Sequence, residues 1–384
     1  MKTNIKHHAI NWSDGMKLSQ RYFSANDAHM HDMIRDAASV PINSFNYGLM
    51  PRLEGMSSSL KLIVNNHPSS HVELVLEYCN AVTSNGTRII YIPELYENDS
   101  PRLSISASDM DGKQEASFNI LVNINPFKNI PIGTPDPEEI PLRHPYSFPE
   151  ISLQSMPASQ TNNNFIGAFQ FLIGEVQWKN SNFSWHDAYI PPCTAIASHP
   201  TLTAVLEETL QIFNQLKDHS TTIIRKNAFG KPVNNKLAEN TCGICSVILE
   251  FIANNVFEFR QILKNRPPVY YVNKISILAN LINTFLIQTK DREKEELLQY
   301  YHEWENVRPV DFESVLGELM ELNYNHTDIQ ASLKAVKKFL GTLLLVWQKL
   351  SQLEYVGQRK DNIVIREEVQ LASDNGERRW SLLD

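Results

Sequence analysis

Positive charge is scarce in this sequence, which has 35 Lys and Arg residues against 43 Asp and Glu and a formal net charge of −8. Proteins that bind nucleic acid usually carry a basic surplus or a basic stripe on one face. The nearest approach to a basic run is RKNAFGK at 225–231, and a solvated loop explains it better. We therefore expect no nucleic-acid partner.

Long hydrophobic runs are also missing. No stretch approaches the roughly 18 consecutive apolar residues that a membrane-spanning helix needs. The segment FLGTLLLVW at 339–347 is too short and is flanked by Lys337, Lys338 and Lys349. The N-terminal MKTNIKHHAINW is mildly basic but has no apolar core of a signal peptide. These absences predict a cytoplasmic protein that does not insert directly into a membrane.

Cysteine is rare, and four residues in a chain of 384 do not make a disulfide framework. Cys242 and Cys245 have the spacing of a redox or metal-binding pair. A thioredoxin-like dithiol needs a strand before it and a helix after it, whereas a helical pattern lies on both sides here. The favoured interpretation is two small buried hydrophobes on a helix. A thiol oxidoreductase that uses Cys242 and Cys245 stays open as an alternative.

Catalytic and cofactor-binding motifs are absent as well. None of the 12 histidines lies in an HExxH or comparable arrangement of metal ligands. GTPDP at 133–137 lacks the Lys-bearing, Gly-rich loop that cradles phosphates. Neither a GxSxG motif nor a pair of carboxylates with a site around them is present. We expect no enzyme activity, no metal and no cofactor.

The first half of the chain contains short segments rich in β-branched and aromatic residues, separated by turn residues. Regularly spaced short strands predict an antiparallel β-sandwich, here over residues 1–190. A proline-rich segment at 131–150 predicts a long surface loop suited to a partner contact. The expected strands lie at 69–82, 87–95, 102–108 and 116–127, with one or two more within 163–178.

The second half shows apolar residues at spacings of three and four, the pattern of amphipathic helices. Several long helices with short links predict an antiparallel α-helical bundle over residues 191–356, followed by a short strand and tail over 357–384. The fold class is therefore α+β and multidomain. The first expected helix begins near Thr201, and the second covers Asn235–Lys264. The third starts near Ile275 and continues into the charged residues 290–307, and the last covers Asp328–Leu353.

Some apolar stripes are wide enough to suggest burial against other subunits as well as within the bundle. The candidates for this packing are Ile248, Phe251, Leu340, Leu343 and Trp347.

The N-terminal segment INWSDGMKLSQRYF at 10–23 carries an unusual apolar load for a region that normally frays. Its large side chains either fill the core of their own domain or contact a partner. Both alternatives remain open at this point. The residues concerned are Trp12, Met16, Leu18, Tyr22 and Phe23.

Three stretches together resemble TssK, the family of baseplate subunits in bacterial type VI secretion systems. They are NWSDGMKLSQRYF at 11–23, DAYIPPCTAIASHPTL at 187–202 and RPPVYYVNKISILANLINTFL at 266–286. The first departs from the family pattern at residues 19–22. The positions that match in the three stretches are Trp12, Asp14, Gly15, Met16, Leu18 and Phe23; Ile190, Pro191, Pro192 and Leu202; and one of Pro267 and Pro268, one of Tyr270 and Tyr271, Leu278, Ala279 and Phe285.

The resemblance implies a homotrimeric structural adaptor with a β-sandwich shell and a helical neck. Its expected partners are the wedge proteins TssF and TssG and the membrane complex or a substitute anchoring protein, near the inner membrane. About 30 residues follow the last expected helix, so the resemblance implies a short form without the usual C-terminal head domain. A phage-tail-like receptor-binding or adaptor protein with the same shell is the alternative.

Overall fold

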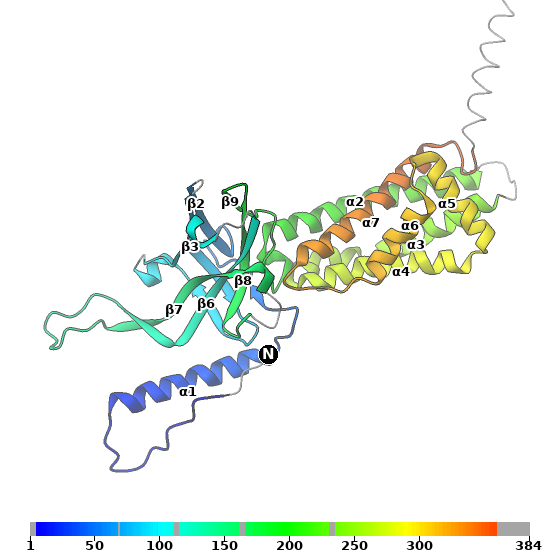
Figure 1. Ribbon diagram of the computed structural model, residues 1–384. Helices are drawn as coiled ribbons and strands as arrows, with labels where there is room; N and C mark the ends of the chain where they lie inside the picture. Colours follow the sequence, from blue (N-terminus) through cyan, green and yellow to red (C-terminus); the bar gives the residue numbers. More distant parts are fainter. Residues whose placement is uncertain are drawn as a thin grey trace, which may run out of the picture. The chain divides into compact units, whose positions relative to one another are not determined.

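A computed structural model describes residues 5–67, 70–97, 99–110, 115–160, 166–229 and 235–358. The chain divides into two compact units. Unit 1 comprises Met1–Leu206, Gln261–Tyr271 and Asn323–Leu333, and unit 2 comprises Glu207–Arg260, Val272–Leu322 and Lys334–Asp384. Apart from one N-terminal helix, antiparallel sheets come first in the chain and helices follow them (Figure 1), which confirms the predicted α+β class.

The first sheet of unit 1 is built around β3 (His71–Val82), which is twelve residues long and mostly buried. β2 (Leu60–His67) and β1 (Gly48–Leu49) pair with β3 along one edge, and β4 (Arg88–Tyr91) and β5 (Arg102–Ser106) pair along the other. Because β3 is covered on both faces, its sequence HVELVLEYCNAV has few polar positions. The strands expected at 69–82, 87–95 and 102–108 all lie here.

The second sheet has the strand order β7-β6-β8-β9. Its strands are β6 (Glu115–Ile132), β7 (Tyr146–Pro157), β8 (Gln170–Lys179) and β9 (Asn182–Trp185). The sheets join through side chains, since Tyr96 Oη donates to Pro149 O at 3.1 Å and Asn66 Nδ2 donates to Phe183 O at 2.6 Å.

The prediction of one long loop over residues 131–150 was wrong at both ends. β6 continues to Ile132 and β7 begins at Tyr146, with Pro131 opposite Ser147 in the ladder. Prolines are tolerated in this hairpin because one side of each backbone needs no partner there: β7 is an edge strand, and β6 pairs with β8 only as far as Asn123. Only residues 133–145 form the loop, which starts at Gly133 with φ +91°.

Within the described ranges, α1 (Gln20–Ser39) lies in the N-terminal part and six more helices follow from residue 200 onward. The later ones are α2 (Pro200–Phe229), α3 (Lys236–Gln261), α4 (Pro268–Gln288), α5 (Asp291–Glu305), α6 (Pro309–Met320) and α7 (Ile329–Gln352). The prediction that one helix continues from Ile275 into the charged segment was wrong. Lys290 has an extended backbone, so α4 ends and α5 begins anew at Asp291. The sequence patterns also missed α1 and α6.

Residues 323–333 belong to unit 1, and His326 joins them to Tyr47, which lies just before β1. His326 Nε2–H donates to Tyr47 O at 2.9 Å, and Tyr324 Oη donates to His326 Nδ1 at 2.9 Å. Burial disfavours the imidazolium and lowers the pKa of His326 from 6.5 to about 4. The ring is therefore a neutral structural link at physiological pH. Asp328 caps α7 by accepting a hydrogen bond from Ala331 N at 3.1 Å.

Among the described residues, α3 is long and apolar enough to cross a membrane by length and composition alone. Core helices of soluble proteins pass the same test, so this is weak evidence. In this chain α3 packs within unit 2, where it buries Thr241, Ile244, Cys245, Ile248, Phe251, Ile252 and Phe259. The short strand expected within 357–384 lies outside the described residues, apart from positions 357 and 358.

Candidate interaction surfaces

A buried carboxylate of α1, that of Asp32, binds the N-terminal residues that precede the helix. Asp32 Oδ2 accepts from Lys6 N at 2.8 Å, from His7 N at 2.9 Å and from the His7 ring at 2.9 Å. Arg35 adds an ion pair at 3.3 Å. Burial by itself would raise the pKa of Asp32, but the backbone bonds from His7 and Lys6 outweigh it, and the pKa falls to about 2.

The polarity of α1 is the reverse of that of an ordinary surface helix. Its buried residues are Asp32, Arg35 and Ser39, all polar. Its large apolar side chains are exposed instead, although an amphipathic helix normally turns them toward the core. We define the N-terminal apolar patch as Trp12, Leu18, Phe23, Met30, Met33 and Ile34, all of which are exposed.

The five residues that the sequence singled out near the N-terminus lie at one end of this patch. Trp12, Leu18 and Phe23 are exposed, and Met16 and Tyr22 are half-buried. The ring of Trp12 lies 6.4 Å from those of both Tyr22 and Phe23, centroid to centroid. Their contacts are with one another, so this segment leaves aromatic surface uncovered. Exposed apolar patches of this kind mark interaction sites.

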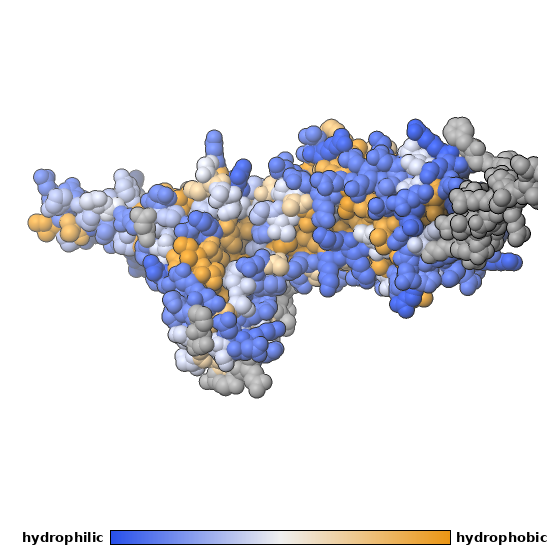
Figure 2. Space-filling view, turned by 90° about the horizontal axis from the view of Figure 1, so that it is seen from above, coloured by the Kyte–Doolittle hydropathy of each residue, from blue (hydrophilic) through white to orange (hydrophobic). Residues whose placement is uncertain are grey.

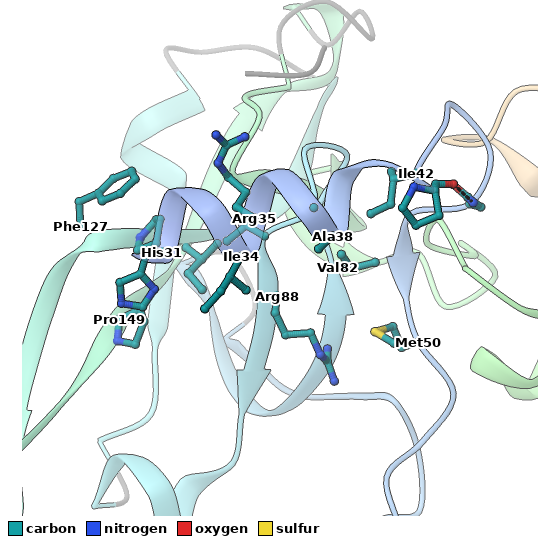
Figure 3. Close-up of a pocket in the computed structure, with 16 residues that line it drawn as sticks. His31, Ile34, Arg35, Ala38, Ile42, Met50, Val82, Arg88, Phe127 and Pro149 are labelled. Atoms are coloured by element: carbon teal, nitrogen blue, oxygen red, sulfur yellow. Dashed lines mark hydrogen bonds between the residues drawn. The ribbon is translucent and has the colours of Figure 1, made fainter. Parts of the chain in front are cut away.

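A cavity of about 500 Å³ lies between α1 and the sheets of unit 1 (Figure 3). Ile34 and Ala38 of α1 face it, with Phe127 and Pro149 toward one end and Met50 toward the other. We call it the α1 cavity. It has the size of pockets that bury a drug-sized group.

The closeness of α1 to the sheet depends on Gly86 in the turn between β3 and β4. This glycine has φ +93°, and a Cβ there would lie 2.7 Å from Arg35 O and from Ser39 N. A side chain at position 86 would therefore push the C-terminal half of α1 away and open the cavity.

The loop of the β6–β7 hairpin, residues 133–145, is a further apolar surface, which we call the hairpin tip. Figure 1 shows the hairpin extending past the neighbouring strands, and Figure 2 shows hydrophobic side chains at its far end. Ile140 is 97% exposed and Leu142 is exposed as well. Glu139 and Arg143 form an ion pair at 2.7 Å across the tip.

The five residues predicted for subunit or bundle packing all lie in the core of unit 2. Ile248, Phe251, Leu340, Leu343 and Trp347 are buried within the single chain. The burial assigns them to the bundle, and little of their surface is left for a neighbouring copy. Unit 2 instead exposes other apolar side chains: Phe257 on α3 and Ile277, Leu281 and Ile287 on α4.

The thiols do not have the environment of a redox centre. Cys242 is half-buried and Cys245 is buried, both within α3. Burial raises the pKa of Cys242, and it raises that of Cys245 to about 12, whereas a reactive thiol needs a lowered pKa. No cluster of three or more His, Cys, Asp or Glu that could hold a metal occurs within the described part of the chain.

The fold of the chain is similar to that of solved TssK structures. It matches a crystal structure of TssK with a TM-score of 0.53 and 14% identity, over 91% of this chain and 70% of that one. It matches a chain of a type VI secretion baseplate complex with a TM-score of 0.50 and 14% identity, over 88% and 99%. A chain of a TssK–TssF–TssG baseplate subcomplex aligns with a TM-score of 0.49 and 12% identity, over 88% and 99%.

No family model and no curated protein matches the sequence. The resemblance in the three sequence stretches is therefore supported at the level of the fold.

The sequence analysis identified Trp12, Leu18 and Phe23 of the N-terminal apolar patch. It did not identify the three patch residues that follow on α1, which are Met30, Met33 and Ile34. Phe23, Met30 and Ile34 recur at helical spacing, a signal that was present in the sequence but was not connected with the residues before it. The α1 cavity had no such signal, because its walls come from segments far apart in the chain.

Proposed function

We propose that this chain is a TssK-type structural subunit of a type VI secretion baseplate, without catalytic activity. It acts in the cytoplasm near the inner membrane as a homotrimer, and it joins the TssF/TssG wedge to the membrane-anchored part of the machine. Support comes from the fold similarity to TssK over most of the chain and from the three matching sequence stretches.

The observation that carries the partner assignment is the reversed polarity of α1. A helix that buries Asp32 and Arg35 while exposing Phe23 and Ile34 loses free energy in water unless its outer face is covered. The end of the N-terminal apolar patch formed by Trp12, Leu18 and Phe23 is therefore the wedge-binding surface in this proposal. Aromatic side chains such as Trp12 and Phe23 are the residue types in which binding energy concentrates.

The self-association in this proposal uses the exposed apolar side chains of unit 2. Ile277 and Leu281 lie one turn apart on α4, and α3 presents Phe257. Lys274 of α4 pairs with Glu258 of α3 at 2.7 Å, which fixes these two helices against each other. Three copies of this apolar face buried around a common axis would remove it from water.

Co-expression with the TssF and TssG proteins of the same genome tests the proposal. Affinity purification through a C-terminal tag on this chain should recover both wedge proteins in fixed ratio. Light scattering on the purified chain alone should give three times the monomer mass of 43.9 kDa.

A monomer at micromolar concentration would contradict the trimer. A stable trimer that captures neither wedge protein would contradict the wedge assignment and would favour an adaptor of another tail-like machine.

A further inference from the structure

We propose that the hairpin tip of one copy docks into the α1 cavity of a second copy. Both surfaces belong to unit 1. This inference rests on the self-association of the proposed function, but it assigns a separate contact made by the shell. Neither the exposed face of unit 2 nor the wedge-binding end of the N-terminal apolar patch is needed for it.

The geometry of the hairpin excludes docking of the tip into its own cavity. Phe127 and Pro149, at the base of the hairpin, form part of the cavity wall. From there the ladder carries the strands outward, with Asn129 opposite Pro149 and Ile132 opposite Tyr146. The tip thus lies at the far end of the hairpin whose base borders the cavity, so a tip that fills this cavity has to come from another copy.

The apolar content of the two surfaces is matched. The tip presents Ile140, almost fully exposed, and Leu142, and nothing in unit 1 covers them among the described residues. The cavity offers a wall formed by Ile34, Ala38 and Phe127, of which Ile34 is itself exposed. Seating two branched side chains there removes apolar surface from water on both copies.

The charges of the two surfaces are opposite. The tip carries Asp136, Glu138 and Glu139, and of these Glu139 already pairs with Arg143. The sixteen described residues that line the cavity include no Asp or Glu, whereas two arginines are among them. Arg35 already pairs with Asp32, which leaves Arg88 as the arginine that can receive an acidic group.

Arg88 lines the cavity and has no carboxylate partner among the described residues. Its guanidinium donates to Ala81 O at 2.6 Å, to Ile89 O at 3.0 Å and to the Asn80 side chain, all neutral acceptors. Burial lowers the pKa of Arg88, as expected for a charge whose surroundings do not fully compensate it. An acidic tip supplies the negative charge that Arg88 lacks, and this charge pairing fixes the orientation of docking.

A tip-to-cavity contact uses different surfaces on the two partners, so it is heterologous. Such a contact builds a ring when the rotation between copies closes. Each copy would then donate one tip and accept one, which is compatible with a trimer held together by unit 2.

Cysteine cross-linking on the full chain tests the contact. In a Cys242→Ser background, Ile140→Cys on the tip is combined with Ala38→Cys in the cavity. The other native cysteines are buried. A short bismaleimide should then give covalent dimers and trimers on a denaturing gel. The matched control combines Ile140→Cys with Ser104→Cys, an exposed position on β5, and should give about tenfold less product or none.

A charge reversal gives a second readout on the same variant. Asp136→Lys with Glu138→Lys should lower the cross-linked fraction about tenfold, because the tip then repels the cavity. The control reversal, Glu207→Lys with Glu295→Lys, changes the net charge equally at exposed positions of unit 2 and should leave the cross-linking unchanged.

The outcomes separate this inference from the proposed function. A trimer by light scattering that gives no product from Ile140→Cys with Ala38→Cys overturns the contact and leaves the trimer in place. Cross-linking of the cavity cysteine to TssF or TssG in the co-purified complex, in place of the tip, also overturns it. A clean monomer overturns both proposals. Should Ala38→Cys not fold, Ile34→Cys replaces it under the same criteria.

Discussion

Replacement of Phe23 and Trp12 by alanine distinguishes a binding patch from a folding core. In the free chain Trp12 is 47% exposed and Phe23 is 53% exposed. An aromatic side chain buries roughly 150–250 Å² when fully covered, so about 100 Å² of each remains available to a partner. At about 25 cal/mol per Å², that area is worth about 2.5 kcal/mol, which is a loss of roughly 70-fold in affinity for each residue.

The same arithmetic limits how much Trp12→Ala and Phe23→Ala can lower the free energy of unfolding. The half of each ring that is already covered is worth at most about 2.5 kcal/mol to the free energy of unfolding, below the ~3–5 kcal/mol of a fully buried aromatic. Tyr355→Ala is the matched control, because Tyr355 is 44% exposed and lies in unit 2. It should lower the melting temperature similarly without weakening wedge binding.

The assay pairs a thermal melt with a binding titration against purified TssF–TssG for Trp12→Ala, Phe23→Ala and Tyr355→Ala. We expect comparable melting for all three variants and weakened binding for the first two. Unchanged binding in folded Trp12→Ala and Phe23→Ala variants would refute the assignment of the patch to the wedge. A melting loss far above that of Tyr355→Ala would show that the aromatic residues act through folding instead.

Further predictions concern unit 2, the thiols and pH. Leu343→Asp should unfold unit 2, as measured by circular dichroism, because an unpaired buried charge costs at least about 4 kcal/mol of folding free energy. Leu281→Asp should leave a folded chain that light scattering shows to be a monomer. Cys242→Ser with Cys245→Ser should keep assembly and lose about 1 kcal/mol of stability per buried thiol in urea melts; loss of assembly in a normally folded variant would restore a role for the thiols. His326 has a lowered pKa, so its contribution is complete above pH 6.5 and is lost as the pH falls toward 4. Unit 1 should lose up to about 3 kcal/mol over that window, and His326→Gln should flatten the profile.

The sequence predicted the class and order of the elements wherever a pattern is local. The apolar run of β3 and the helical spacing of α3 and α7 were visible because each is set by burial along one continuous segment. Proline misled the prediction at residues 131–150, since whether a strand tolerates it depends on lying at a sheet edge. That position is a property of the strand order and cannot be seen in the segment itself.

The sequence also identified Trp12 and Phe23 as unusual, but it could not decide between core and surface. That decision came from Asp32, which accepts the backbone of Lys6 and His7 and so holds the polar face of α1 inward. Apolar side chains were left outside as a consequence, which no hydrophobicity pattern indicates.

By itself, then, the amino-acid order determined most of the strands and the long helices that carry a regular apolar pattern, and it marked Trp12 and Phe23 as unusual. Tertiary structure alone decided that Leu340 and Leu343 are buried within one chain and that Ile277 and Leu281 are exposed. It also brought α1, β6 and β7 together around a cavity. The physical reason is that exposure and enclosure depend on distances between segments remote in the chain, whereas periodicity records only the immediate neighbourhood of each residue.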